Sequence, residues 1–377
     1  MPIAEARAWV ELDAGALRAN YDTIRRSVVK GTAIIPMVKA DGYGLGLELA
    51  VRTLEPLEPW GFGVATVREG EAVRRLGVTR PVLLITPLPM GEVQLAARCR
   101  LTVGISSMDA LDAWVGAADR LGGEALDFHV EVDTGMGRTG LDWREVGDWG
   151  PAVMSRLGPG VRWSGCFTHF HSSDLPDERP GMAQWERFQQ TLVQLPVPAT
   201  DLMVHASNSA AILRWPRFGA DAVRPGIFLY GGHPAPGVEG VPAPVGVAAV
   251  RSRLLLVRQK LPDSTVGYAA TYTARSPERW GTVGIGYADG IRRAVGNVAS
   301  VLVRGRRVPV IGRVSMDSLT VSLQDVPDAK VGDVVTLIGE AGGQRITVDE
   351  FASWVGTISN EILTGLGDRL PRVKRDG

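Results

Sequence analysis

The chain has 377 residues with 41 basic and 41 acidic side chains, so its formal net charge is zero. This balance excludes a strong non-specific attraction to nucleic acid or to an anionic membrane surface. The amino terminus lacks the basic start and apolar core of a secretory signal, and no apolar run reaches the ~18 residues that a membrane helix needs. With Cys99 and Cys166 as the only cysteines, we expect a soluble, cytoplasmic protein with one large domain and one smaller domain.

In chain order, a strand at Ala8–Leu12 precedes a region in which strand-like and helix-like segments alternate. Eight such repeats within the first 230 residues are typical of an α/β fold of the TIM-type (β/α)8 barrel class, whereas a doubly wound sheet usually has fewer strands per domain. The expected barrel strands are Ala33–Lys39, Trp60–Val67, Pro81–Leu88, Arg100–Ser106, Leu126–Asp133, Trp163–Phe170, Leu202–Asn208 and Ala222–Tyr230.

The composition changes at a Pro/Gly-rich stretch, Gly231–Pro244, which we interpret as a linker. Short β-type runs follow it without long helices between them, until a helical piece at Val348–Thr357. We therefore expect a barrel over residues 12–235 and a mainly β C-terminal domain made of residues 1–11 and 236–377, with Ala8–Leu12 pairing in the latter. The expected strands of the second domain are Val247–Gln259, Gly281–Gly286, Ala299–Gly312, Ser318–Leu323 and Val331–Ile338.

The stretch from Ala33 to Gly46 carries the first candidate residue. Its apolar run ends on Lys39, and a glycine-rich turn that contains Tyr43 follows before helical spacing resumes. A lysine at the mouth of a buried strand loses solvation, which makes its neutral amine easier to reach and suits a Schiff-base lysine. The alternative is a lysine that only marks the strand end and extends to water.

Further polar side chains fall at the carboxyl ends of the predicted barrel strands, where barrel enzymes place their chemistry. On the fifth strand His129, Glu131 and Asp133 share the inward face, and an all-polar inward face is costly unless it serves a site. The other strand-end candidates are Lys39, the segment 133–138, His169, Asn208, Ser209, Arg224, Pro225 and Gly226.

Two other motifs suggest different sites. The segment from Gly135 to Gly140 fits G-x-G-x-x-G, but it follows the fifth strand and holds an arginine, which argues against a dinucleotide site. His169 and His171 with Asp174 suggest a metal, yet no further carboxylate or cysteine cluster completes a coordination shell. We therefore expect no metal, and we expect His205 and Cys166 to be core groups or supports of the site.

Taken together, the motifs resemble those of the alanine racemase family, and the resemblance covers nearly the whole chain. It implies a pyridoxal 5'-phosphate (PLP) enzyme of the barrel type, and a homodimer in which the β domain of one subunit completes the barrel site of the other. The matching stretches are Val38-Lys-Ala-Asp-Gly-Tyr-Gly44, Asp133-Thr-Gly-Met-Gly-Arg138, Thr168-His-Phe170, Asn208-Ser-Ala210, Val223-Arg-Pro-Gly-Ile227, Val266-Gly-Tyr268, Gly286-Tyr-Ala-Asp-Gly290 and Gly312-Arg-Val-Ser-Met-Asp317.

The resemblance implies that Lys39 holds PLP as an aldimine and acts as the base on one face of the substrate. Tyr268 of the neighbouring subunit would be the base on the other face, with His169 hydrogen-bonded to it. Arg224 would face the pyridine nitrogen and, because its pKa is above ~12, leave that nitrogen unprotonated. The expected activity is the interconversion of L- and D-alanine by this two-base mechanism.

The remaining cofactor and substrate contacts also come from the resemblance. Barrel loops and a helix start after Asn208 would supply N–H donors to the cofactor phosphate. Arg138 would steer the cofactor's phenolic oxygen and the substrate carboxylate, which the Met316 N–H would also meet. The expected phosphate residues are Tyr43, Ser209, Gly226 and Ile227, and the expected substrate residues are Arg138, Met316, Tyr287 and Asn360.

Two positions depart from the family pattern. Glu131 stands where many members have a lysine carboxylated on its amine, so we expect independence from bicarbonate, with contact to Arg138 either direct or through water or an anion. Asn360 stands where the family usually has tyrosine, and serine racemases of the family resemble this chain there. A serine or broader-specificity racemase is therefore the alternative within the family.

Two functions of other classes remain as alternatives. A non-catalytic PLP-binding barrel protein would lack the second domain and Tyr268, both of which this chain has. A decarboxylase of the same fold type would need a cysteine-bearing motif in the β domain, which has no cysteine.

Overall fold

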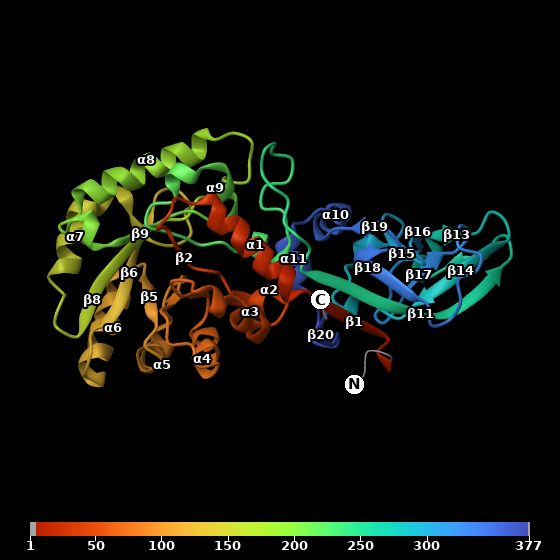
Figure 1. Ribbon diagram of the computed structural model, residues 1–377, viewed down its shortest axis with the longest axis horizontal. Coiled ribbons are helices and arrows are strands. Elements are labelled where there is room, and N and C mark those ends of the chain that lie inside the picture. The colour runs from red at the N-terminus through yellow and green to blue at the C-terminus, as the bar shows by residue number, and fades with distance from the viewer. Residues whose placement is uncertain (1–4, 376–377) are drawn as a thin grey trace.

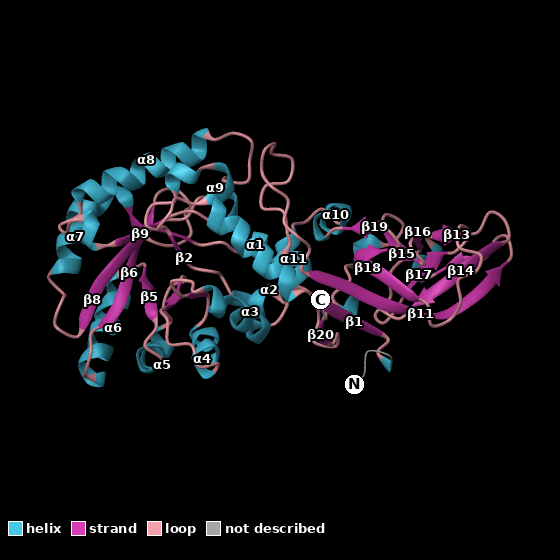
Figure 2. Cartoon of the chain, in the orientation of Figure 1, coloured by secondary structure: helices cyan, strands magenta, loops and turns pink. Residues whose placement is uncertain are grey.

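The computed structural model describes residues 5–375, which form a barrel and a mainly β domain side by side. Figure 1 shows the barrel at the left, from red through green, and the β domain at the right, in green-cyan to blue. In Figure 2 helices surround the barrel strands, whereas the second domain is drawn almost entirely as strands. The predicted fold class, an α/β barrel followed by a mainly β domain, is confirmed.

Eight parallel strands form the barrel sheet, in the order β2-β10-β9-β8-β6-β5-β4-β3. A parallel bridge between Met37 and Gly63 joins the two ends of this order and closes the ring. The strands are β2 (Ala33–Ile34), β3 (Phe62–Val64), β4 (Val82–Leu84), β5 (Thr102–Ile105), β6 (Leu126–Asp133), β8 (Val161–Phe167), β9 (Met203–His205) and β10 (Ala222–Val223), with β7 (Leu141–Asp142) beside β6.

All eight predicted barrel strands are present, but most are shorter than expected. In the first one, Pro36 has no N–H to donate, so the regular ladder stops after Ile34. The extended chain beyond it is still held on both sides, because Met37 N–H donates to Pro225 O at 2.9 Å and Val38 N–H to Gly63 O at 2.8 Å. Lys39 thus follows a fixed segment, as the sequence predicted.

The barrel helices pack one apolar face on the strands. In α1 (Ala14–Ser27) the Asp13 carboxylate accepts the Ala16 N–H and begins the helix, and Leu17, Tyr21 and Ile24 share its buried face. The others are the short α2 (Lys39–Tyr43), α3 (Leu47–Leu54), α4 (Val67–Arg75), α5 (Val93–Arg98), α6 (Met108–Leu121), α7 (Val146–Met154), α8 (Arg179–Gln194) and α9 (Ser209–Arg214).

The β domain is built on a nine-stranded sheet with the order β19-β18-β15-β16-β17-β14-β11-β1-β20. Its first strand in the chain, β1 (Ala8–Leu12), pairs antiparallel with β11 (Ala248–Lys260) and parallel with β20 (Arg372–Lys374), so the predicted pairing of Ala8–Leu12 is confirmed. The other strands are β14 (Glu278–Val283), β15 (Ser300–Val303), β16 (Arg306–Ile311), β17 (Leu319–Ser322), β18 (Val334–Ala341) and β19 (Gln344–Ile346), with a separate pair, β12 (Thr265–Val266) and β13 (Tyr272–Thr273).

One predicted strand of this domain, Ala299–Gly312, is a hairpin. The left-handed conformations of Arg304 (φ 50°) and Gly305 (φ 76°) turn the chain between β15 and β16. Helices α10 (Val348–Trp354) and α11 (Ser359–Thr364) follow the sheet and lead back to the barrel, where Arg372 Nη2 donates to Gly44 O at 3.0 Å. Within residues 5–375, no helix combines the length and the apolar character needed to cross a membrane.

Candidate active site

Lys39 is the first residue of a left-handed turn. The φ angles of Ala40, Asp41 and Tyr43 are 51°, 53° and 57°, and each costs an L-residue roughly 1–2 kcal/mol. Hydrogen bonds close the turn, since Gly42 N–H donates to Val38 O at 2.9 Å and Gly44 N–H to Ala40 O at 2.7 Å. Such strain persists only where the surroundings enforce it, which makes this turn a candidate functional element.

Glu69 stabilises this turn from α4, the helix that follows the next barrel strand, β3. Its Oε1 accepts the Ala40 N–H at 2.6 Å, and its Oε2 accepts the N–H groups of Ala65 and Thr66 at 2.8 and 3.0 Å. One carboxylate therefore joins the ends of the first two barrel strands beside Lys39. Glu69 is not among the residues predicted from the sequence: the pattern Thr66-x-x-Glu69 indicates a helix cap, but nothing in the sequence indicates its contact with Ala40.

A cavity of about 290 Å³ opens at the carboxyl ends of the barrel strands. Burial lowers the pKa of Lys39, Arg138 and Arg224 lower it further, and Glu69 opposes them. The neutral amine is thus easier to reach than in water, as the sequence analysis expected. Of the predicted site residues, those lining the cavity are Lys39, Tyr43, His169, Ser209, Arg224, Gly226, Ile227 and Asn360.

Arg224 is buried, and protein acceptors fix most of its guanidinium. Nη1 donates to His205 Nδ1 at 2.5 Å, while Nη2 donates to the carbonyl oxygens of Thr168 and Ala206 at 2.8 and 3.1 Å and lies 3.3 Å from His169 Nδ1. Within residues 5–375 no hydrogen bond is formed by Nε, so this donor is left for the cavity that Arg224 lines. Burial lowers the pKa of Arg224 to about 10, so the side chain stays protonated at neutral pH.

Histidines behind Arg224 stay neutral. Because arginine only donates, His205 Nδ1 must accept, and its protonated Nε2 donates to His129 Nδ1 across 2.8 Å. Burial, then Arg224, depress the pKa of His205, and burial lowers the pKa of His129 to about 3. His205 is therefore a support of the site, as expected. At the cavity wall, burial and then Arg224 lower the pKa of His169 to about 3.

A group of hydrogen-bond donors that could bind an anion also lines the cavity. Ser209 Oγ accepts the Gly226 N–H at 2.8 Å, which leaves its own proton free to be donated. The Tyr43 ring stacks on Tyr230 with 4.6 Å between centroids, and a Cβ added to Gly226 would lie 2.1 Å from the Tyr43 hydroxyl oxygen. Among the described residues, no acceptor meets the Ile227 N–H. The group fits a phosphate, so the cavity suits PLP.

The inward carboxylate of β6 is satisfied by hydroxyl groups. Glu131 is 4% exposed, and its two oxygens accept from Ser106 Oγ and Thr139 Oγ1, both at 2.7 Å. Within the described chain no ion pair or hydrogen bond joins Glu131 to Arg138, and the hydrogen bonds of the carboxylate come from Ser106 and Thr139. Direct contact, one of the two arrangements we considered, is not found.

Two glycine amides of the loop after β6 are already bonded within the protein. Asp133 Oδ1 accepts the N–H groups of Gly135 and Gly137 at 2.8 and 3.1 Å, so a protein carboxylate already fills the turn. The loop instead presents Arg138, which is exposed and close enough to Lys39 to lower its pKa.

Four predicted site residues do not line the cavity of their own chain: Arg138, in the loop after β6, and three residues of the β domain. Tyr268, Tyr287 and Met316 are 67%, 42% and 51% exposed. Figure 1 shows β13, which follows Tyr268, in the β domain well away from the barrel. A single chain thus brings together the lysine, the arginine and the anion donors, but not the tyrosine.

A closed (β/α)8 barrel with a desolvated lysine, an anion cradle and a buried arginine around one cavity defines a PLP-binding barrel protein. Family models agree: "Alanine racemase, N-terminal domain" matches residues 12–234, and "Alanine racemase, C-terminal domain" matches residues 247–374. The chain therefore belongs to the alanine racemase family. The predicted family and its PLP cofactor are confirmed.

Individual relatives extend over the whole chain. An alanine racemase of Symbiobacterium thermophilum is 38% identical over 369 residues, which cover 97% of this chain and 96% of that protein. The crystal structure of alanine racemase from E. faecalis superposes with a TM-score of 0.91 at 31% identity, covering 98% of each chain. An alanine racemase from Bartonella henselae with covalently bound pyridoxal phosphate superposes with a TM-score of 0.88 at 28% identity, covering 98% of this chain and 100% of that one.

Proposed function

We propose that this protein interconverts L- and D-alanine with PLP held on Lys39. The observation that carries the proposal is the single cavity in which Lys39, Arg224 and the anion donors meet, in a chain that matches both alanine racemase domains. When bound, the cofactor withdraws electrons from the substrate's Cα and so makes its hydrogen acidic. The phosphate would be held by the hydroxyls of Tyr43 and Ser209 and by the N–H groups of Gly226 and Ile227. In this structure the Gly226 N–H donates to Ser209 Oγ.

The protein's own groups would then hold and move protons. Lys39 Nζ serves one face of Cα, and its lowered pKa favours the neutral amine that accepts a proton. The free Nε of Arg224 would donate to the pyridine nitrogen, and this protonated arginine leaves that nitrogen without a proton of its own. Arg138, whose guanidinium has no bonded partner within residues 5–375, would hold the substrate carboxylate together with the Met316 N–H and, at the side, Tyr287.

We further propose that Tyr268 of a second copy is the base on the opposite face, in a homodimer with shared sites. Three observations support this: Tyr268 is 67% exposed, it lies in the β domain, and the cavity of its own chain lacks it. His169 accepts from Arg224 at Nδ1, so its Nε2 carries the proton that can be donated to the Tyr268 oxygen. A neutral His169 would thereby assist loss of the phenol proton.

Subunit mixing tests the shared site. Neither Lys39→Ala nor Tyr268→Phe alone should racemise alanine, whereas a mixture refolded together should regain activity, because one of the two sites in each heterodimer is intact. Mixtures that stay as inactive as both parents would contradict the shared site. A wild-type holoprotein that binds PLP but turns over no alanine would instead favour a non-catalytic PLP-binding protein.

A broader-specificity racemase is the second candidate, and Asn360 favours it. Its side chain lines the cavity beside Tyr43 and Ile227, and no described residue bonds its amide. The amide is thus available to a substrate hydroxyl, and a hydrogen bond of this kind contributes ~0.5–1.5 kcal/mol. We propose alanine as the main substrate, with serine turned over as well.

A further inference from the structure

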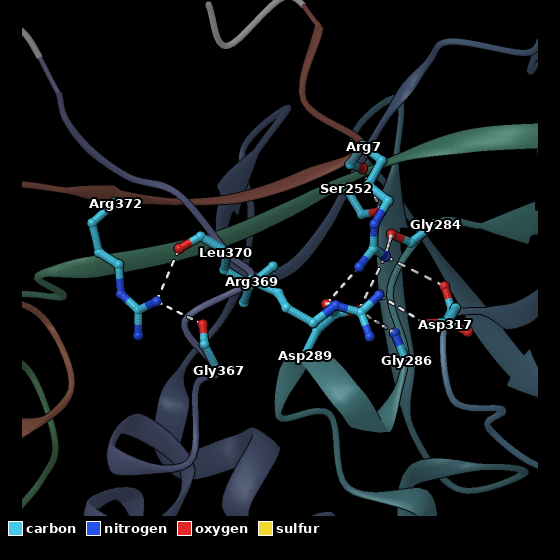
Figure 3. A network of polar contacts seen from close by, with 10 residues as sticks. All are labelled: Arg7, Ser252, Gly284, Gly286, Asp289, Asp317, Gly367, Arg369, Leu370 and Arg372. Carbon is cyan, nitrogen blue, oxygen red and sulfur yellow. Dashed lines mark hydrogen bonds and ion pairs between the residues drawn. The ribbon is translucent and has the colours of Figure 1, made fainter. Parts of the chain in front are cut away.

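A buried carboxylate, Asp289, lies where three distant segments of the β domain meet (Figure 3). Its side chain is 0% exposed. Oδ1 accepts from Arg7 Nη2 at 2.6 Å and lies 3.3 Å from Arg369 Nε, and Oδ2 accepts from Arg7 Nη1 at 3.1 Å and from the Gly286 N–H at 3.0 Å. Arg369 continues to Asp317, with 2.7 Å between Nη2 and Oδ1. We call these four charged residues the Asp289 network.

The Asp289 network supports two loops that are also joined by their backbones. The N–H groups of Tyr287 and Ala288 donate to the carbonyl oxygens of Ser315 and Met316 at 3.0 and 2.9 Å. The approach is so close that a Cβ on Gly286 would lie 2.4 Å from both of those oxygens. The backbones of the two loops are therefore joined directly, and the arginines Arg7 and Arg369 bind this pair of loops through the carboxylates of Asp289 and Asp317.

Burial of the Asp289 carboxylate is hard to explain as a source of stability, because Arg7 and Arg369, which pair with it, remain 34% and 45% exposed. A buried ion pair loses the solvation of its charges, and the attraction between them offsets this loss only when the geometry is good. Replacing such a pair with apolar residues is often neutral or stabilising for the fold. What such a pair does provide is one fixed arrangement. Here the fixed parts are the backbones that carry Tyr287 and Met316, which are 42% and 51% exposed.

We propose that Asp289 is a positioning residue that holds Tyr287 and the Met316 N–H in register for the amino-acid substrate in the other subunit's cavity. This inference rests on the proposed function, because it assumes that both residues act across a dimer. Asp289 itself touches neither substrate nor cofactor. It would act by holding the loop of Tyr287 through the Gly286 N–H and the loop of Met316 through Arg369 and Asp317.

The test is Asp289→Asn in the holoenzyme. Asparagine keeps the size, but its amide places a donor where Oδ1 or Oδ2 accepts. In either orientation the amide opposes Arg7, together with Arg369 at Oδ1 or with the Gly286 N–H at Oδ2. We expect KM for alanine to rise about tenfold or more while kcat changes much less. The reason is that contacts to the substrate's carboxylate are weakened equally in the ground state and in the transition state. In the apoprotein, hydrogen exchange should quicken at the amides of Tyr287 and Ala288 but not in β14 or β17.

Glu11→Gln is the matched control, because Glu11 also pairs with an arginine of the same sheet, Arg251, across 3.2 Å. Its KM should stay at the wild-type value. If Asp289→Asn fails to fold, Arg369→Met is the second variant: it removes the links from Arg369 to Asp289 and Asp317 but leaves Arg7 on Asp289. Because the Arg369 side chain is 45% exposed, the variant should fold, and KM should still rise. An unchanged KM in a folded variant of either kind would overturn the inference, whereas a wild-type protein without racemase activity would overturn the proposed function.

Discussion

Gly226→Ala tests the anion cradle most directly. The added Cβ would lie 2.1 Å from the Tyr43 hydroxyl oxygen and 2.9 Å from its Cζ, far inside van der Waals contact. Tyr43 has little freedom to yield, because its ring stacks on Tyr230 and the Tyr230 hydroxyl is itself bonded to Met37 O at 2.9 Å. The substitution should therefore displace either the Tyr43 hydroxyl or the N–H groups at 226 and 227.

Each displaced donor removes one hydrogen bond to a charged phosphate, which contributes about 1.5–3 kcal/mol. At 1.4 kcal/mol for each factor of ten, the dissociation constant of PLP should rise about 10- to 150-fold. Titration of the apoprotein with PLP, followed by absorbance, measures this constant. Gly147→Ala is the control, since an added Cβ meets no atom within 4 Å there and φ is not left-handed. A Gly226→Ala protein that binds PLP as tightly as Gly147→Ala would refute the reasoning.

Three further results are expected. Because Glu131 carries a fixed carboxylate that two hydroxyls hold, racemase activity should survive removal of bicarbonate; a loss that added bicarbonate restores would contradict this. In Asn360→Tyr the ratio of kcat/KM for L-serine to that for L-alanine should fall, because the amide open to a hydroxyl is gone, and an unchanged ratio would exclude Asn360 as a determinant. The pKa of His129 is about 3 in the native state and ~6.5 in the unfolded chain, so between these pH values unfolding takes up a proton. The contribution of neutral His129 to the free energy of unfolding is therefore fully present above the unfolded pKa and is lost as pH falls toward the native one. The free energy of unfolding, measured in urea, should fall by about 1.4 kcal/mol per pH unit for this group as pH drops from 6 to 4, and His129→Gln should show a slope smaller by that amount.

Much of the fold was predictable from the sequence because the signals are local. Alternating strand and helix patterns placed all eight barrel strands, and the switch at Gly231–Pro244 marked where long helices stop. Strand lengths were overestimated because apolar residues continue past the end of the regular ladder, as after Ile34 in the first strand. The hairpin at Arg304 and Gly305 was missed because its turn carries a non-glycine residue at positive φ.

The sequence by itself also indicated the candidate site residues Lys39, Arg224 and Ser209, which stand at predicted strand ends in recognisable motifs and line one cavity in the structure. What only the tertiary structure decided is which groups meet them. Glu69 reaches Ala40 from the next strand along the chain, His205 accepts from Arg224, and hydroxyls rather than Arg138 satisfy Glu131. The physical reason is that hydrogen-bond partners are fixed by distances between segments far apart in the chain, which local patterns of polarity do not encode.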